Sequence, residues 1–211
     1  MDGIDEENKK GQMNLPASEL PEEPAKPNDF RTSLHWRVFR ILSEFVDGWQ
    51  FLADFKKTVS FFGSARFVEG DRWYEEARKL GKMAGEDGFA VVTGGGPGIM
   101  EAGNRGAVEG NGDSLGLNIK LEMEQRINPY VKESIAFHYF FVRKVMLSFA
   151  ARAYVFFPGG FGTLDEVFEL LTLIQTKKIS DKIPVVLVGK EFWDPIDKWF
   201  KEEIFEKYHT I

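Results

Sequence analysis

Short apolar runs alternate with longer amphipathic stretches over most of this chain. The apolar runs predict six strands, at 58–63, 89–93, 114–119, 134–137, 154–157 and 183–188. The stretches between them predict helices at 73–86, 142–151, 163–176 and 193–207, and one more that ends at 108. Several strands are apolar on both faces, which indicates a sheet covered on both sides. The pattern therefore predicts an α/β fold, a Rossmann-like doubly wound parallel sheet with helices on both faces.

The first 55 residues precede this alternation. Residues 1–29 contain four prolines among Glu, Asn and Lys, a composition typical of a flexible tail. From 30 to 55, apolar residues recur at spacings of three and four, which predicts an amphipathic N-terminal helix. We expect residues 30–211 to form a single domain that includes this helix. The predicted apolar stripe consists of Leu34, Val38, Ile41, Leu42, Phe45, Trp49, Leu52 and Phe55.

The same helix also predicts an assembly of several copies. Trp36, Trp49 and Phe51 give it more apolar surface than a peripheral arm needs. Such surface often marks an interface between proteins. We therefore expect the helix to pack across the main domain or against a second subunit, in a homodimer or a higher homo-oligomer.

Composition narrows the classes of protein and of site. The absence of cysteine excludes disulfides and thiolate chemistry, and it fits a reducing cytoplasm, where we expect the protein to work. A net charge of −6 without a basic run argues against nucleic acid as a partner. No apolar run approaches the length of a membrane span, and the acidic start is unlike a secretory signal. The three histidines show no metal-ligand spacing.

Two glycine-rich segments each follow a predicted strand directly. The first is Gly94-Gly95-Gly96-Pro97-Gly98, and the second is Pro158-Gly159-Gly160-Phe161-Gly162-Thr163. A glycine turn leaves backbone N–H groups uncovered, and the start of the next helix adds a partial positive charge. This combination suits a phosphate group. Because parallel strands end at the same edge of a sheet, we expect both turns to face one crevice and to bind a nucleotide.

Neither segment carries a standard phosphate-binding signature. In the first turn, Ile99 or Glu101 stands where the third glycine of the dinucleotide fingerprint would be, depending on the starting glycine. The sequence also lacks the Gly-Lys-Ser/Thr of a P-loop. The first turn therefore has a second interpretation, a tight strand-to-helix turn without a ligand.

The second turn leaves two roles open for each of its polar residues. Thr163 stands where the N-cap of the following helix is expected, so its hydroxyl could cap the helix or bind a phosphate oxygen. Glu166 follows three residues later, which is capping-box spacing. The alternative for Glu166 is a carboxylate beside the phosphate, where it would meet positive charge that develops on a sugar.

Arg143 and Lys144 follow the aromatic run 138–141 near the start of a predicted helix. Two cations at this position oppose the helix dipole, which indicates a nearby anion or acidic side chain. Arg143 suits bidentate binding of a phosphate or carboxylate. We interpret His138 as a packed or solvent-edge residue rather than a catalytic base. The aromatic run is interpreted as core, with adenine stacking as the alternative.

These residues resemble the LOG (Lonely Guy) family, whose older label is lysine decarboxylase. The matching pieces are Pro-Gly-Gly-x-Gly-Thr-x-x-Glu at 158–166, the pair Arg143-Lys144, and the segment 93–101. The resemblance extends over about 58–188. It implies a Rossmann-like dimer or higher oligomer that cleaves the N-glycosidic bond of nucleoside 5′-monophosphates to free base and ribose 5-phosphate. AMP or an N6-modified AMP is the expected substrate, with no metal or cofactor required.

The resemblance also implies roles for individual residues. Arg143 and Glu166 would be the catalytic pair, and Lys144 an auxiliary ligand contact. Thr172 would be a further nucleotide contact. The remaining residues expected to bind substrate or phosphate are Gly63, Ser64, Gly95, Gly96, Gly159, Gly160, Phe161, Gly162 and Thr163.

One departure from the family pattern concerns the base. Plant members carry Met-His ahead of the Arg-Lys pair, whereas Phe140-Phe141-Val142 precedes Arg143 in this chain. The base preference and any role with cytokinins are therefore open. A different class of function also fits the phosphate site, a non-catalytic carrier of a nucleotide or of the molybdenum cofactor. Glu166 separates the two, because a carrier has no use for a carboxylate aimed at C1′. A third reading, an interaction protein with purely structural turns, predicts no nucleotide binding.

Overall fold

The computed structural model describes residues 33–120 and 127–210. The chain divides into two compact units, Met1–Arg40 and Ile41–Ile211. Helix α1 (Leu34–Ala53) begins in the first unit and continues into the second. The tail predicted at 1–29 lies outside the described residues.

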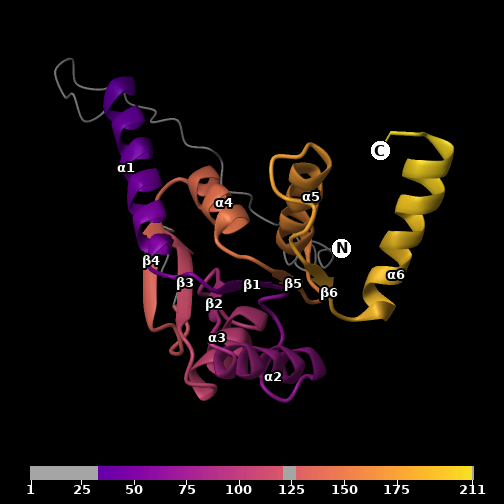
Figure 1. The fold of residues 1–211 in the computed structure, drawn as a ribbon, viewed down its shortest axis with the longest axis horizontal. Coiled ribbons are helices and arrows are strands. Elements are labelled where there is room, and N and C mark those ends of the chain that lie inside the picture. Colours follow the sequence, from indigo (N-terminus) through magenta and orange to yellow (C-terminus); the bar gives the residue numbers. More distant parts are fainter. Residues whose placement is uncertain (1–32, 121–126, 211) are drawn as a thin grey trace, which may run out of the picture. The chain divides into compact units, whose positions relative to one another are not determined.

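Six strands of the described chain form one sheet in which every pairing is parallel (Figure 1). Their order is β4-β3-β2-β1-β5-β6. The predicted α/β doubly wound fold is thereby confirmed. The strands are β1 (Thr58–Phe62), β2 (Ala90–Thr93), β3 (Ser114–Ile119), β4 (Glu133–Phe137), β5 (Tyr154–Phe156) and β6 (Val185–Leu187).

The predicted helices are present, but several begin or end elsewhere. They are α2 (Arg72–Glu86), α3 (Ile99–Glu109), α4 (Phe140–Phe149), α5 (Phe161–Gln175) and α6 (Lys190–Trp199), followed by the π-helix η3 (Phe200–Lys207). The helix predicted at 193–207 is thus two elements, and it starts earlier because Gly189, at φ +96°, turns the chain directly into α6. Helix α5 also starts two residues earlier than predicted, after Gly160.

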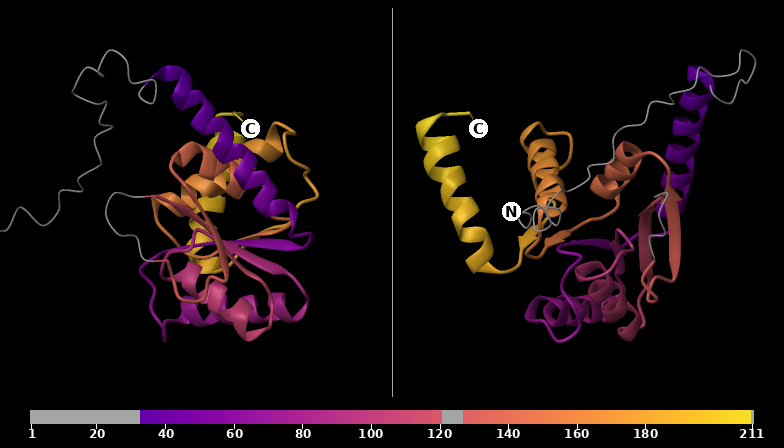
Figure 2. Two further views of the ribbon diagram at one scale, coloured as in Figure 1. Left: turned by 90° about the vertical axis from the view of Figure 1, so that its left-hand side faces the viewer. Right: turned by 180° about the vertical axis from the view of Figure 1, so that it is seen from behind.

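The sheet is covered on both faces, with α2 and α3 on one side and α4 and α5 on the other (Figure 1, Figure 2). Successive strand residues alternate between two cores. Phe61 and Val155 pack on the α2/α3 side, whereas Phe62 and Phe156 stack on the other side at 4.9 Å between ring centroids. Because both faces are buried, apolar residues can occupy neighbouring positions in one strand.

From Ile41 onward, α1 packs against α4 and β4. The approach is close at Gly48, where a side chain would meet Met146 and Phe137. This contact fixes which side of the helix faces the core, so the predicted stripe is only partly right. Leu42 and Trp49, both in that stripe, are exposed. The predicted stripe residues that do pack on the core are Ile41, Phe45, Leu52 and Phe55, and Phe51 joins them.

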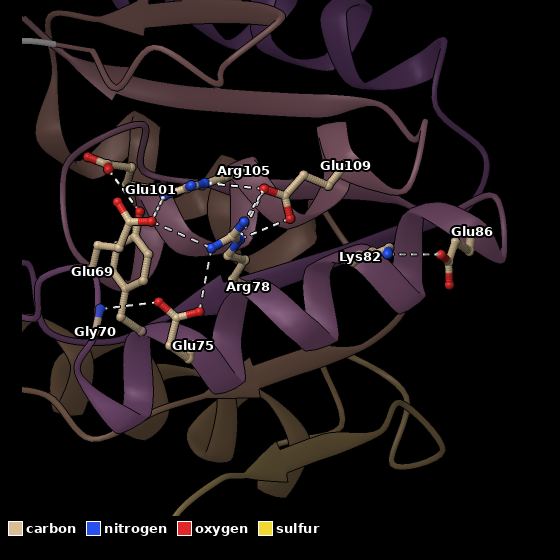
Figure 3. Close-up of polar contacts among 10 residues, drawn as sticks. Glu69, Gly70, Glu75, Arg78, Lys82, Glu86, Glu101, Arg105 and Glu109 are labelled. Carbon is tan, nitrogen blue, oxygen red and sulfur yellow. Dashed lines mark hydrogen bonds and ion pairs between the residues drawn. The ribbon is translucent and has the colours of Figure 1, made fainter.

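Helices α2 and α3 are held together by backbone contact and by ion pairs. Gly81 lies so close to the carbonyl of Gly103 that a side chain would not fit. At the rim, Arg78 pairs with Glu109 at 2.7 Å (Figure 3). The Tyr74 hydroxyl donates to Glu101 at 2.9 Å. Glu101, the last residue of the first glycine motif, therefore joins two helices. No helix within the described residues is both long and apolar enough for a membrane span.

Candidate active site

Three loops meet at the carboxyl edge of the sheet, where β1 lies between β2 and β5. The chain leaves β1 for β2 on one side and later returns to β5 on the other, so this is the switch point where open α/β sheets bind ligands. The Ser64 N–H donates to the Pro158 carbonyl at 3.0 Å, and the Ile99 N–H donates to the Ser64 carbonyl at 3.1 Å. These bonds bring Gly63 and Ser64 together with both glycine turns.

The second glycine turn presents a set of free backbone donors. The N–H groups of Gly159, Gly160, Phe161 and Gly162 donate to none of the described residues. The space that side chains at Gly160 and Gly162 would fill is open. Gly159, by contrast, lies against Thr163, which closes the turn. Free N–H groups at the start of a helix, with open space before them, form a site suited to an anion.

The capping role considered for Thr163 and Glu166 is wrong. The N-cap of α5 is Gly160, whose carbonyl accepts from the N–H groups of Thr163 and Leu164, both at 3.0 Å. Thr163 is therefore the third residue of the helix and Glu166 lies in its second turn. Neither makes a capping hydrogen bond, and both are 6% exposed.

The buried carboxyl of Glu166 has unusual electrostatics. It forms no hydrogen bond with any described residue. Burial raises the pKa of Glu166 from 4.5 to about 7; Lys144 opposes the rise, Glu169 and Asp165 add to it, and Arg143 opposes it. Near neutral pH this carboxyl therefore exchanges between its protonated and ionised forms, and a nearby cation shifts it toward the carboxylate.

Arg143 reaches the first glycine turn from α4. Its Nε donates to the Leu117 carbonyl at 2.7 Å, and its guanidinium lies against Gly94, where a side chain would collide with it. Both terminal nitrogens donate to no described residue. Burial lowers the pKa of Arg143, and nearby Glu166 partly offsets this effect, although the two side chains form no ion pair within the described chain. A buried guanidinium fork without an acceptor favours an anionic or hydroxyl ligand.

Lys144 points to protein carboxylates instead. Its Nζ contacts Glu169 at 2.8 Å and also pairs with Asp165, so it links α4 to α5. Burial alone would lower the pKa of Lys144, but the hydrogen bonds to Asp165 and Glu169 raise it above its ordinary value. These carboxylates account for the acidic partner that the sequence requires near two cations at a helix start.

Sequence reasoning missed a layer of buried amides under the first glycine turn. Asn128 donates from its backbone to the Gly95 carbonyl at 2.9 Å and from Nδ2 to the Gly96 carbonyl at 3.0 Å. The same Nδ2 donates to Asn104, which also accepts from the Thr93 hydroxyl. Gly95 has φ +74°, a conformation that glycine adopts without strain. No periodic pattern marks Asn104 or Asn128, so only their burial reveals them.

Some candidates lie away from this group of residues. Thr172 stands ten residues beyond Gly162 on α5, a rise of about 15 Å, and its exposed side chain donates to the Phe168 carbonyl. His138 is exposed, as interpreted. The aromatic run is not all core, because Phe140 and Phe141 are 55% and 48% exposed.

Metal-ligating side chains do not gather in the described part of the chain, which holds no group of three or more His, Asp or Glu that could bind an ion.

The chain is similar in sequence to enzymes that act on nucleotides. The family described as "Possible lysine decarboxylase" matches residues 100–210. The pyrimidine/purine nucleotide 5′-monophosphate nucleosidase of Escherichia coli strain K12 is 30% identical over 125 residues, which are 55% of this chain and 28% of that protein. The cytokinin riboside 5′-monophosphate phosphoribohydrolase LOG of Oryza sativa subsp. japonica is 31% identical over 144 residues, 67% of this chain and 58% of that protein. The chain thus spans less than two thirds of the length of either relative.

Solved structures share the fold. The molybdenum cofactor carrier protein of Chlamydomonas reinhardtii matches with a TM-score of 0.54 and 25% identity, over 68% of this chain and 86% of that one. The molybdenum cofactor binding protein of Rippkaea orientalis matches with a TM-score of 0.55 and 20% identity, over 70% and 86%.

Proposed function

This chain belongs to the LOG family, which carries the description "Possible lysine decarboxylase", and on that premise we propose that it hydrolyses the N-glycosidic bond of nucleoside 5′-monophosphates. The products are the free base and ribose 5-phosphate. One observation carries the proposal. A buried carboxyl with a pKa near 7, Glu166, lies within electrostatic reach of an arginine fork without an acceptor, on the helix that begins with a turn of free N–H groups.

The turn at 159–163 holds the 5′-phosphate in this proposal. Its free N–H groups point out of the start of α5, where the helix dipole also favours negative charge. The phosphate is remote from the bond that breaks. Binding it therefore positions the ribose and supplies energy that is used in the transition state.

Glu166 acts on the sugar. As the bond from C1′ to the base nitrogen breaks, positive charge develops on the ribose ring, and a carboxylate in a buried site stabilises it strongly. The same group orients or activates the water whose oxygen bonds to C1′, while the departing base takes up a proton. A pKa near 7 suits a group that works in both protonation states.

Arg143 orients the nucleotide. The bond from Nε to the Leu117 carbonyl fixes the side chain and leaves both terminal nitrogens for the ligand. Ribose hydroxyls and phosphate oxygens are acceptors that such a fork binds in a defined orientation. Lys144 stays an auxiliary contact, acting through Asp165 and Glu169 on the helix that carries Glu166.

We take AMP or an N6-modified AMP as the substrate. The E. coli relative is named for pyrimidine and purine nucleotides and the rice relative for cytokinin ribosides, both as 5′-monophosphates. The decarboxylase description receives less support. A lysine that forms a Schiff base needs a depressed pKa, whereas hydrogen bonds raise that of Lys144.

A carrier of a nucleotide or of the molybdenum cofactor is the second candidate. The similarity to the Chlamydomonas carrier protein supports it, because a carrier would use the same phosphate turn. Burying Glu166 without a hydrogen bond destabilises the protein, and a carrier gains nothing from that arrangement.

We further propose that copies of the chain associate. Apolar side chains are exposed on α1 and at the end of α4, with Trp49 and Phe149 in contact at 5.9 Å between ring centroids. A second copy is the occupant expected for this surface.

The activity is tested by incubating the purified protein with AMP, CMP, GMP and UMP and separating free base by chromatography. Release of adenine together with ribose 5-phosphate supports hydrolysis. Tight AMP binding without any release of base would favour the carrier instead. Absence of binding to every nucleotide would leave the glycine turns as structural features.

A further inference from the structure

Asn118 is a polar residue at the carboxyl end of a strand that is otherwise buried among apolar side chains. It occupies the next-to-last position of β3, directly after Leu117, whose carbonyl accepts the Nε bond of Arg143. The side chain is 5% exposed. Carboxyl ends of strands are where ligands bind in folds of this class. Asn118 therefore lies at the edge that carries the proposed active site.

The amide of Asn118 has no hydrogen-bond partner. Two buried side-chain polar atoms in the described residues lack one, Asn118 Nδ2 and the hydroxyl oxygen of Ser60. Asn118 Oδ1 accepts no bond from the described chain either. Ser60 lies in the middle of β1, away from the crevice. An unpaired buried amide donor destabilises a protein.

The neighbouring amides have hydrogen-bond partners, so the lack of a partner at Asn118 is not a property of the whole region. Asn104 Nδ2 donates to Ser114 at 2.8 Å and to the Leu115 carbonyl at 3.3 Å. Asn128 uses Nδ2 twice and accepts at Oδ1 from the Tyr130 N–H at 3.1 Å. Both are as deeply buried as Asn118. The fold thus satisfies two amides under the first glycine turn and leaves the third free.

Two adjacent glycines make room for two side chains that have donors without an acceptor. A side chain at Gly94 would collide with the guanidinium of Arg143, and a side chain at Gly95 would collide with the amide of Asn118. The turn is therefore shaped around both residues. Arg143 is the side chain proposed to orient the nucleotide, and Asn118 lies against the next residue of the same turn, Gly95.

We propose that Asn118 binds the base of the nucleotide. The phosphate turn follows β5, and β3 is three strands away in the order β5-β1-β2-β3. At the usual strand spacing this is about 14 Å, a span that an extended nucleoside monophosphate bridges, with its C1′ bond near Glu166 and Arg143. This inference rests on the proposed function and adds the residue that contacts the base.

Asparagine suits the edge of a base because its amide carries one donor and one acceptor side by side. Nucleobases present ring nitrogens, exocyclic amines and carbonyl oxygens in the same plane, and asparagine pairs with two of them at once in adenine. The last torsion of an asparagine side chain is broad, so the amide turns toward a ligand at little cost. Nδ2 then gains the acceptor that the protein does not supply.

The test compares Asn118→Leu, which keeps the shape of the side chain, with the wild type. Calorimetry is done with both proteins carrying Glu166→Gln, which slows hydrolysis, and with AMP and ribose 5-phosphate, which lacks the base. We expect about a tenfold loss of AMP affinity, the effect of one neutral hydrogen bond, and unchanged affinity for ribose 5-phosphate. The melting temperature should stay the same or rise, because an unpaired amide has been removed. Asn104→Leu is the matched control and should lower it.

The outcomes separate this proposal from the function on which it rests. Equal losses for AMP and ribose 5-phosphate, or a fall in melting temperature as large as that of Asn104→Leu, would make Asn118 a support of the turn and overturn the proposal. Wild-type affinities in Asn118→Leu would also overturn it while leaving the hydrolase intact. A wild-type protein that binds neither ligand would remove the proposed function, and this inference with it.

Discussion

The guanidinium of Arg143 lies against the backbone of Gly94, in the space that a side chain at position 94 would fill. Residues from two elements thus depend on one missing Cβ atom. The turn after β2 has room for the arginine from α4 only because residue 94 has no side chain. The glycine and the arginine should therefore behave as one functional unit.

Gly94→Ala is expected to lower turnover about as much as Arg143→Ala. The added methyl group displaces the guanidinium from its place beside Leu117, and misplaced catalytic groups lose roughly 10²-fold. The check is a double-mutant cycle on adenine release. The double variant should be no slower than either single variant, because both remove the same arrangement. Additive losses would show that the two residues act separately.

Glu166→Gln should lower turnover by about 10²-fold or more while keeping the fold and most of the AMP affinity. The amide preserves shape but cannot stabilise positive charge on the ribose as a carboxylate does. Adenine release under saturating AMP is the measurement. Glu202→Gln, an exposed site on η3, is the matched control and should behave as the wild type. Normal turnover in Glu166→Gln would end the catalytic assignment.

The raised pKa of Glu166 also predicts how stability depends on pH. The folded chain holds this proton up to about pH 7, whereas the unfolded chain releases it near 4.5. Stability contributed by this group is therefore lost as pH rises through that window, and the full effect is about 3 kcal/mol. Urea unfolding at pH 5 and pH 8 should show a smaller fall for Glu166→Gln than for the wild type. Parallel pH slopes for the two proteins would mean that Glu166 titrates normally.

AMP should bind at least tenfold more tightly than adenosine. The free N–H groups of the turn at 159–163 contact only the phosphate in the proposed complex, and charge-assisted hydrogen bonds are the strong ones. Calorimetry with a slow variant, such as Glu166→Gln, gives both affinities. Comparable values would place the phosphate elsewhere.

The apolar surface formed by Trp49 and its neighbours on α1 and α4 predicts a dimer or larger assembly at micromolar concentration. Light scattering coupled to gel filtration gives the mass in solution. Trp49→Glu should weaken the assembly, because a charge would be buried in the interface. A monomeric wild-type protein at this concentration would contradict the prediction.

Much of the fold could be predicted because periodicity reports burial. The strand at 114–119 was predicted with its observed bounds, since it follows the turn residues Gly112 and Asp113 and has apolar side chains at every second position. Helix ends were harder. Thr163 looks like an N-cap by residue type, yet Gly160 caps α5 because its conformation allows the helix to begin there. The contact at Gly48 determines which side of α1 faces the core. The spacing of residues within the helix does not reveal this contact.

The parts of the candidate site that glycines mark could be predicted from the sequence. The residues that tertiary contacts bring to the site could not. Both turns were found from their glycines, but Asn128 reaches the first turn from a distant loop. Asn118 left a signal that was overlooked, a lone amide in an apolar strand. The oligomeric state, the cytoplasmic location and the roles of the site residues stay predictions.

The open space at Gly160 and Gly162 has a consequence for protein engineering. Replacing glycine by alanine at the start of a helix is a common way to raise thermostability, and here an added methyl group would meet nothing in the ligand-free protein. A screen that selects only for heat resistance would therefore accept Gly162→Ala, which lies inside the helix, but not Gly160→Ala, because alanine is a poor N-cap. The methyl group at position 162 would stand where the phosphate is proposed to bind, so such a screen would select inactive enzymes unless a nucleotide were present.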